Sequence, residues 1–192
     1  MTQCSEQEVA RLLPLVSQQR RQQALAYKHL FGQYCSLKSY EMLMHLLADN
    51  QYPITDTPFF IYNEYGQPQL EGGPCFSISH CKQAIAVAIS DNPIGIDIEG
   101  IRNVQTSLIE KTMNEEERNR IVASTDANLA FVRLWTQKEA YLKMKGTGII
   151  ADLKTTLEGV DPTKVVIDTV EYTDKGYVMS LAHASVDTNG LS

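Results

Sequence analysis

The first fifty residues space their apolar side chains at intervals of three and four, which is typical of amphipathic helices. Ser5 with Glu8 three residues later forms a capping box and predicts the start of a helix. Pro14 is expected to interrupt that helix, and Ser17 to cap a second one. The third predicted helix carries an apolar face made by Leu37, Tyr40, Met44 and Leu47. This region is therefore expected to be helical, with these faces packed in a core.

The pattern then changes to alternation and turn residues, which predicts strands. Strands are expected at 59–62, 76–79, 84–89 and 94–99, with turns at 63–66 and 91–93. Helical spacing returns from about residue 106 to 145, and strands are expected again at 165–172 and 177–184. This order of helices, strands, helices and strands predicts an α+β fold with mainly antiparallel pairing.

Three residues predict helix boundaries in the second half of the chain. Asn114 is a suitable N-cap for a helix that begins with three glutamates, which the helix dipole favours in the first turn. Asp126 is a suitable N-cap for the next helix, and Gly146 is expected to end it.

Composition excludes several classes of protein. The chain has 192 residues and a formal net charge of −6, which argues against a general nucleic-acid binder. No apolar run approaches the ~20 residues of a membrane span, and the first residues do not form a signal peptide. The four cysteines show neither a disulfide framework nor zinc-ligand spacing, so reduced thiols in the cytoplasm are expected.

Asp97 and Glu99 form the first candidate site. Residues two apart on a strand share a face, so both carboxylates point away from Ile96 and Ile98. Two adjacent carboxylates repel each other unless a cation or a proton lies between them, and such oxygen ligands suit Mg²⁺. The alternative is a solvated face of an edge strand.

Glu139 and Lys143 form the second candidate site, one helical turn apart and one turn after Trp135. A functional interpretation makes Glu139 a third metal carboxylate and Lys143 a cation for a phosphate. The alternative is a surface ion pair near a core tryptophan. The spacing alone does not decide between the two.

Ser79 and His80 form the third candidate site, at the end of a predicted strand. Both side chains can donate hydrogen bonds to a phosphate. The sequence contains no nucleophile elbow of the Gly-x-Ser-x-Gly type and no phosphate loop. A bound phosphate would therefore be held by side chains and a metal, while a thiol nucleophile at Cys81 is disfavoured.

Taken together, these segments resemble the Sfp-type 4′-phosphopantetheinyl transferases. That family has, in order, Gly-x-Pro, Phe-Asn-x-Ser-His, Gly-x-Asp-x-Glu, and Trp-x-x-Lys-Glu-Ala-x-x-Lys before a glycine-rich turn. The corresponding residues here are 66–68, 76–80, 95–99 and 135–143, followed by Gly146 and Gly148. The resemblance is strong from Gly66 to Ile150. Ser77 stands where the family usually has Asn, and Cys81 where Ser or Thr is common.

The resemblance implies transfer of the phosphopantetheine arm of coenzyme A to a serine of an acyl or peptidyl carrier protein, with release of adenosine 3′,5′-bisphosphate. It implies Mg²⁺ held by Asp97, Glu99 and Glu139 together with the pyrophosphate of coenzyme A. Lys143 would neutralise that pyrophosphate, and Ser79 and His80 would hold phosphate groups. Lys138 is a candidate for a second phosphate contact.

Two further roles follow from the resemblance. The base that deprotonates the carrier serine is expected to be Glu139 or Glu117. A basic residue near the N-terminus is expected to contact the 3′-phosphate, with Arg20 and Lys38 as candidates.

The resemblance also implies two similar lobes about a pseudo-twofold axis, drawn as residues 1–100 and 101–192, with coenzyme A between them. A monomer is expected, with no nucleic-acid or membrane partner. The alternative function is a non-catalytic module of the same fold that binds coenzyme A or a carrier protein.

Overall fold

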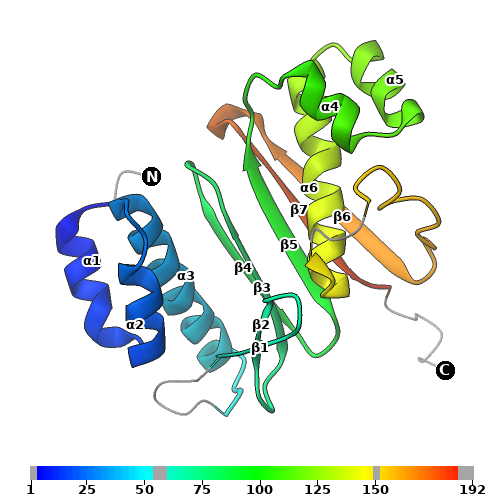
Figure 1. Ribbon diagram of the computed structural model, residues 1–192. Coiled ribbons are helices and arrows are strands. Elements are labelled where there is room, and N and C mark those ends of the chain that lie inside the picture. Colours follow the sequence, from blue (N-terminus) through cyan, green and yellow to red (C-terminus); the bar gives the residue numbers. More distant parts are fainter. Residues whose placement is uncertain (1–3, 54–59, 149–151, 186–192) are drawn as a thin grey trace.

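The computed structural model describes residues 4–53, 60–148 and 152–185 (Figure 1). Its N-terminal helices are α1 (Glu6–Leu12), the 3-10 turn η1 (Leu13–Leu15), α2 (Gln18–Leu25) and α3 (Leu30–Asp49). The hydroxyl of Ser5 accepts from the Glu8 amide at 3.2 Å, and that of Ser17 accepts from the Arg20 amide at 3.2 Å. Both predicted caps are therefore confirmed, and Pro14 lies in the turn that ends α1.

The strands form three small sheets in which every pairing is antiparallel. β1 (Phe60–Tyr62) pairs with β2 (Pro68–Leu70), and β3 (Cys75–His80) pairs with β4 (Ile85–Ser90). The third sheet has the order β5-β7-β6, with bounds β5 (Ile94–Gly100), β6 (Val165–Tyr172) and β7 (Tyr177–Ala184). The predicted α+β class with antiparallel pairing is thus confirmed.

Three helices follow β5, namely α4 (Thr106–Thr112), α5 (Glu115–Ala123) and α6 (Ala127–Lys145). Asn114 and Glu117 form a reciprocal capping box at the start of α5, and Asp126 accepts from the Leu129 amide at the start of α6. Gly146 ends α6 in the left-handed conformation, with φ 70°. The three boundaries predicted from sequence are confirmed because each depends on chemistry within one turn of chain.

The helices lie on the two sides of the strands (Figure 1). Helix α3 packs against β4, and α6 crosses the third sheet, chiefly over β5 and β7. One apolar core lies under α1–α3 and includes Leu37, Leu43 and Phe76. A second core lies under α4–α6, and a third cluster around Ile96 and Ile98 joins β4 to the third sheet.

The two larger sheets meet along β3 and β5, where serine side chains take the place of a backbone ladder. The hydroxyl of Ser77 accepts from the Ile96 amide at 3.0 Å, and that of Ser79 accepts from the Ile98 amide at 3.3 Å. Both serines are buried. Buried backbone N–H groups need an acceptor, so this seam requires small acceptor side chains at these positions. Ser77 satisfies that need although it departs from the family pattern.

The pairing of β5 bears on the predicted lobes. All seven residues of β5 have partners on β7, from Ile94 opposite His183 to Gly100 opposite Tyr177. A boundary drawn at residue 100 would therefore cut the third sheet. The division into two similar lobes stays a prediction.

Two other features complete the description of the fold. Phe59, part of a predicted strand, and Ile150, the end of the resembling region, both lie outside the described residues. Within the described ranges, no helix combines the length and the apolar character that a membrane crossing needs.

Candidate active site

The candidate site forms where β5 crosses α6 without any side chain between the two backbones. A Cβ atom added to Gly95 would lie 1.9 Å from the Ala140 carbonyl oxygen and 2.4 Å from the Met144 amide nitrogen. Only glycine allows this approach. The Gly-x-Asp-x-Glu segment and the Lys-Glu-Ala segment are therefore in direct contact. This contact brings Asp97 beside Glu139 and Lys143, which are distant in sequence.

Asp97 lies at the centre of the site and is only 5% exposed. Its Oδ1 accepts from the Lys143 ammonium at 2.7 Å and from the Ser79 hydroxyl at 2.8 Å. Lys143 also donates to the Ile96 carbonyl at 3.1 Å. The second oxygen of Asp97, Oδ2, is buried without a partner. A solvated strand face is therefore excluded for Asp97.

Glu139 and Glu99 lie close enough to Asp97 to be affected by its charge. Loss of hydration raises the pKa of Glu139, the Asp97 carboxylate adds to the rise, and Lys143 opposes it. The pKa of Glu99 is raised by the same two causes, with Arg102 and Lys143 acting against them. Oε1 of Glu139 is buried without a partner. Three carboxylates thus lie close enough to affect one another, and the cations beside them are Lys143 and, at Glu99, Arg102.

The unpartnered oxygens test whether a divalent cation fits this site. Asp97 Oδ2 and Glu139 Oε1 are hard oxygen donors, and buried donors of this kind are normally satisfied. Their number and chemistry suit Mg²⁺, with Glu99 as the more exposed third donor. Within the described ranges, however, no three such side chains already converge as metal ligands. The chemistry of these oxygen donors suits a divalent cation, whereas their arrangement in this structure does not form a three-ligand site.

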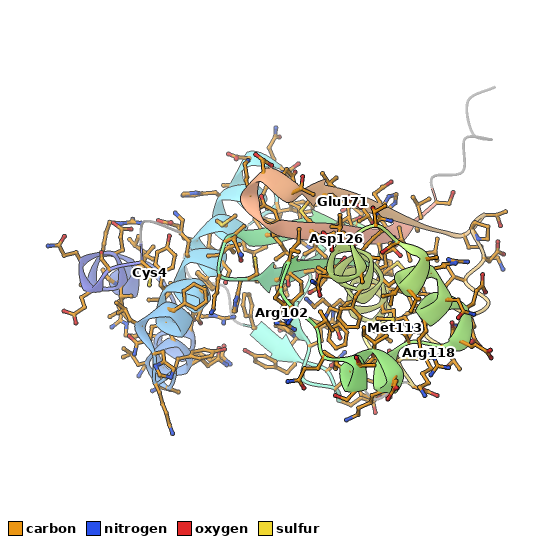
Figure 2. The ribbon with its side chains drawn as sticks, turned by 90° about the horizontal axis from the view of Figure 1, so that it is seen from above. Cys4, Arg102, Met113, Arg118, Asp126 and Glu171 are labelled. Carbon is orange, nitrogen blue, oxygen red and sulfur yellow. The ribbon has the colours of Figure 1, made fainter. Side chains whose placement is uncertain are left out.

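A cavity of about 460 Å³ opens beside this cluster, lined by Glu99 and His80 among others. His80 ends β3 and meets the Phe31 ring edge-on. Loss of hydration and the nearby Lys143 lower the pKa of His80, which favours a neutral ring. Arg102 lies at the same cavity, 3.8 Å from Glu99 and between the N-terminal helices and α4–α5 in Figure 2.

Lys138 does not reach this site, although the sequence predicts a phosphate contact for it. Its ammonium is fully buried and donates to the Thr112 carbonyl, the Leu153 carbonyl and the Glu117 carboxylate. With three acceptors for three donors, it has no capacity left for a phosphate. At 3.6 residues per turn, Lys138 and Lys143 point about 140° apart on α6, a signal already present in the sequence.

Glu117, a predicted candidate base for the carrier serine, also lies away from this site. It is 5% exposed, and its Oε2 accepts from Lys138 at 2.7 Å and from the Asn114 amide at 2.8 Å. Glu117 therefore closes a capping box and neutralises a buried lysine. The structure does not bring it to Asp97.

Ser79 reaches the site, but through the protein rather than through an open face. Its single hydroxyl hydrogen is donated to Asp97, its oxygen accepts from the Ile98 amide, and the residue is 8% exposed. The phosphate contact of Ser79 stays a prediction, and in this structure its hydroxyl is used within the protein. Ser79 orients the Asp97 carboxylate.

Arg20 and Lys38, the two N-terminal candidates, have different surroundings. Lys38 is paired with Glu41 at 2.5 Å, and Glu41 also holds Arg11. Arg20 faces a second cavity of about 460 Å³ whose described lining contains no acidic residue. Its Nε is buried without a partner, and burial lowers its pKa. Arg20 is thus the better placed of the two for an anion.

Two contributors escaped the sequence-based prediction. Gly95 allows β5 to approach α6 because it has no Cβ. The backbone atoms that it approaches belong to Ala140 and Met144, which are 45 and 49 positions later in the sequence. Gln67, the variable residue of the Gly-x-Pro segment, donates to the Lys143 carbonyl at 2.8 Å. Its place between two motif residues was the available signal.

Comparison with known proteins agrees with the motifs. Residues 93–181 match the model of the 4′-phosphopantetheinyl transferase superfamily. The 4′-phosphopantetheinyl transferase gsp of Aneurinibacillus migulanus is 29% identical over 79% of this chain and 65% of its own length. The transferase ffp of Bacillus subtilis is 27% identical over 76% of this chain and 66% of its own.

A third relative, the transferase AcpT of Salmonella typhi, is 36% identical over 48% of this chain and 52% of its own length. The chain thus spans just under two thirds of the first two relatives. The superfamily match covers β5, α6 and the strands that pair beside them, which is the part that builds the acidic cluster. The resemblance read from the motifs is confirmed: this chain is similar to Sfp-type 4′-phosphopantetheinyl transferases over most of its length, and to the superfamily model over residues 93–181.

Proposed function

We propose that this chain transfers the 4′-phosphopantetheine group of coenzyme A to a serine of an acyl or peptidyl carrier protein. The observation that carries the proposal is the cluster of Asp97, Glu99 and Glu139 around Lys143, with two buried carboxylate oxygens unpartnered. Carboxylates this close together favour a bound cation. A divalent cation held there can in turn bind a phosphate oxygen. The relatives bear the name of this activity.

Mg²⁺ is the cation that this donor set fits. Asp97 Oδ2 and Glu139 Oε1 would bind it from the buried side, and Glu99 from the cavity side. When bound, Mg²⁺ would stabilise the charge that develops on the departing phosphate. Ser79 keeps Asp97 in place by its hydrogen bond to Oδ1, which leaves Oδ2 for the metal.

The pyrophosphate of coenzyme A would lie beside Glu99 and His80. His80 opens onto that cavity and can donate one hydrogen bond in its neutral form. Lys143 is 28% exposed, so its ammonium can exchange part of its contact with Asp97 for a phosphate oxygen. This places the only lysine of the cluster where negative charge accumulates.

Arg20 would hold the 3′-phosphate of the nucleotide half. Its guanidinium lies over the Phe60 ring at 4.7 Å and reaches Ser36 at 3.5 Å, so it is held in place while its Nε lacks an acceptor. Tyr27 and Tyr62 line the same cavity and offer aromatic surfaces to an adenine ring.

The transfer itself makes one bond and breaks one. The carrier serine oxygen bonds to the phosphorus of the phosphopantetheine, and the bond from that phosphorus to the bridging oxygen breaks. Adenosine 3′,5′-bisphosphate leaves with the electron pair, and the serine proton passes to a base. Glu139 is the candidate base, because Glu117 is held by Lys138 and loss of hydration raises the pKa of Glu139, which makes its carboxylate a better proton acceptor.

The test is intact mass spectrometry of carrier proteins incubated with the chain, coenzyme A and Mg²⁺. We expect at least one carrier in a panel from fatty-acid, polyketide and peptide synthesis to gain one phosphopantetheine mass. A carrier with its acceptor serine replaced by alanine is the matched control and should gain nothing. No gain across the panel, together with retained coenzyme A binding, would instead support the non-catalytic binding module.

A further inference from the structure

The hairpin β1–β2 lies near the C-terminal end of α6 (Figure 1). Two of its side chains donate hydrogen bonds to that end of the helix. Gln67 donates from Nε2 to the Lys143 carbonyl at 2.8 Å, and Asn63 donates from Nδ2 to the Gly146 carbonyl at 2.9 Å. These bonds link residues 76 and 83 positions apart. We call Asn63 and Gln67 the hairpin latch.

The latch is itself held rigidly. Oδ1 of Asn63 accepts from the amides of Tyr65 and Gln67, at 3.0 and 2.9 Å, and so fixes the turn between the strands. The hairpin is anchored in the N-terminal core by Phe60, which is 3% exposed and packs 5.1 Å from the Phe76 ring. The latch therefore transmits the position of the N-terminal core to α6.

The last carbonyls of a helix lack partners within the helix, and their position is loose unless something binds them. At the end of α6, the Lys143 carbonyl receives both the Gly146 amide and the Gln67 amide. The side chain of the same Lys143 reaches Asp97 at 2.7 Å. One residue thus has its backbone held by the hairpin and its ammonium at the acidic cluster.

The other side of the hairpin lines the Arg20 cavity. Tyr62 and Pro68 belong to that lining, and the Tyr62 hydroxyl meets Gln23 at 2.7 Å. The hairpin therefore connects the two places at which the proposed function puts the two ends of the nucleotide.

We propose that Gln67, supported by Asn63, is a positioning residue that holds Lys143 on Asp97. The role in transfer rests on the proposed function, while the placement of Lys143 does not. Gln67→Glu removes the donor at nearly constant shape, and Gln67→Met removes it without adding charge. Gln69→Glu makes the same charge change on an exposed residue of β2 and is the matched control, since among the described residues the Gln69 side chain makes no hydrogen bond to α6.

The first experiment needs no enzymatic activity. Lysines are acetylated slowly with an N-hydroxysuccinimide ester, and the rate at each lysine is measured by peptide mass spectrometry. Freed from Asp97, Lys143 should react roughly two- to tenfold faster in both Gln67 variants, the range that one lost hydrogen bond gives. Lys145 should be unchanged, and the fully buried Lys138 should stay unlabelled, which shows that the fold persists.

Unchanged reactivity of Lys143 in both Gln67 variants, or an equal rise in Gln69→Glu, overturns the proposal. If Gln67→Glu exposes Lys138, the fold has been lost and Gln67→Met decides.

The second experiment is a double-mutant cycle on the transfer rate. Gln67→Glu should slow transfer by a similar factor in the wild-type background and should add nothing to Lys143→Ala, because it acts through that lysine. Multiplicative losses would contradict this route. If the wild-type chain transfers to no carrier, the proposed function is wrong. The labelling rates still test whether the hairpin latch holds Lys143 on Asp97.

Discussion

Helix α6 carries two lysines that each meet a buried carboxylate at 2.7 Å, and their surroundings are opposite. Lys138 is completely buried, donates to three acceptors, and its partner Glu117 also accepts a backbone amide. Lys143 is 28% exposed, and its partner Asp97 keeps one oxygen unpartnered beside a glutamate in the same state. One pair is fully satisfied, and the other is not.

The difference separates a structural ion pair from a binding site. A buried pair with every donor and acceptor used holds α4, α5 and α6 together and has nothing to offer a ligand. A pair that keeps buried oxygens without a partner among the described residues still has acceptor capacity for a bound ligand. The distance from ammonium nitrogen to carboxylate oxygen is 2.7 Å in both pairs, so this distance alone does not distinguish the two pairs.

The largest expected effect breaks the satisfied pair. Lys138→Met leaves the Glu117 carboxylate buried without its cation, which should cost about 3–5 kcal/mol of unfolding free energy. Adding Glu117→Gln, which keeps a capping-box residue, should recover part of that loss. Urea unfolding measures both, with exposed Lys145→Met as the control. If Lys138→Met lowers the unfolding free energy by less than about 1 kcal/mol, Lys138 and Glu117 do not form the buried, fully hydrogen-bonded pair described above.

Gly95→Ala should disturb the other side of α6. The added Cβ meets the Ala140 backbone at 1.9 Å, so β5 and α6 must separate, at a cost of about 1–3 kcal/mol or more. Because that separation draws Asp97 away from Glu139, cation binding measured by calorimetry should weaken as well. Ala84→Gly is the control, because it changes one small side chain outside the crossing of β5 and α6. Gly159→Ala is not used as a control, because the positive φ of Gly159 would itself strain an alanine. A fully stable Gly95→Ala chain would refute the close approach.

Glu139→Gln should stabilise the chain when no divalent cation is present. The pKa of Glu139 is raised in the folded state, so the folded chain holds this proton at a pH where the unfolded chain has lost it. Stability therefore falls as pH rises above about 4.5, until Glu139 is ionised in both states. The variant should have the higher melting temperature at pH 7.5, and the gain should shrink toward pH 4.5. A lower melting temperature for Glu139→Gln than for the wild type at pH 7.5 would contradict the raised pKa of Glu139.

The smallest effect is expected at an exposed pair with similar geometry. His183 lies 3.0 Å from Asp168 on the third sheet, and Asp168 is 64% exposed. Its bond to the Ala184 carbonyl and the Asp168 carboxylate raise the pKa of His183. This contribution is present below pH 6.5 and lost as pH rises through the folded value, and it should stay below ~1 kcal/mol.

His183→Gln, compared with the wild type at pH 6 and pH 8.5, tests that sign. The difference in melting temperature should be larger at pH 6. A larger difference at pH 8.5 would reverse the assigned pKa direction.

The sequence predicts the parts of this fold that depend on local chemistry. The caps at Ser5, Ser17, Asn114 and Asp126 are confirmed because a cap and its amide lie within one turn. The motifs also identified Asp97 and Glu139, which the structure brings together. The pairing of β5 with β7 could not be predicted, because it joins segments about eighty residues apart and depends on the packing of α6.

The contacts of Lys138, Glu117 and Ser79 were not predictable from the sequence, for one physical reason. A motif shows which residue types occur, whereas a role depends on which groups surround each polar atom. The acceptors that enclose Lys138 come from α4, from α5 and from the chain near Leu153. The hydroxyl of Ser79 is used at a seam between two sheets. Such surroundings are set by tertiary packing.

We propose that transfer depends on the pair of Asp97 and Lys143 and not on the pair of Glu117 and Lys138. The most direct test is the rate of phosphopantetheine transfer to a carrier, followed by intact mass, for Asp97→Asn and for the double variant Lys138→Met with Glu117→Gln. Both are measured at a temperature where circular dichroism shows each to be folded. We expect Asp97→Asn to abolish transfer and the double variant to retain it. Retained transfer in folded Asp97→Asn, or loss of transfer only in the folded double variant, would show that Asp97 is not the carboxylate that transfer needs.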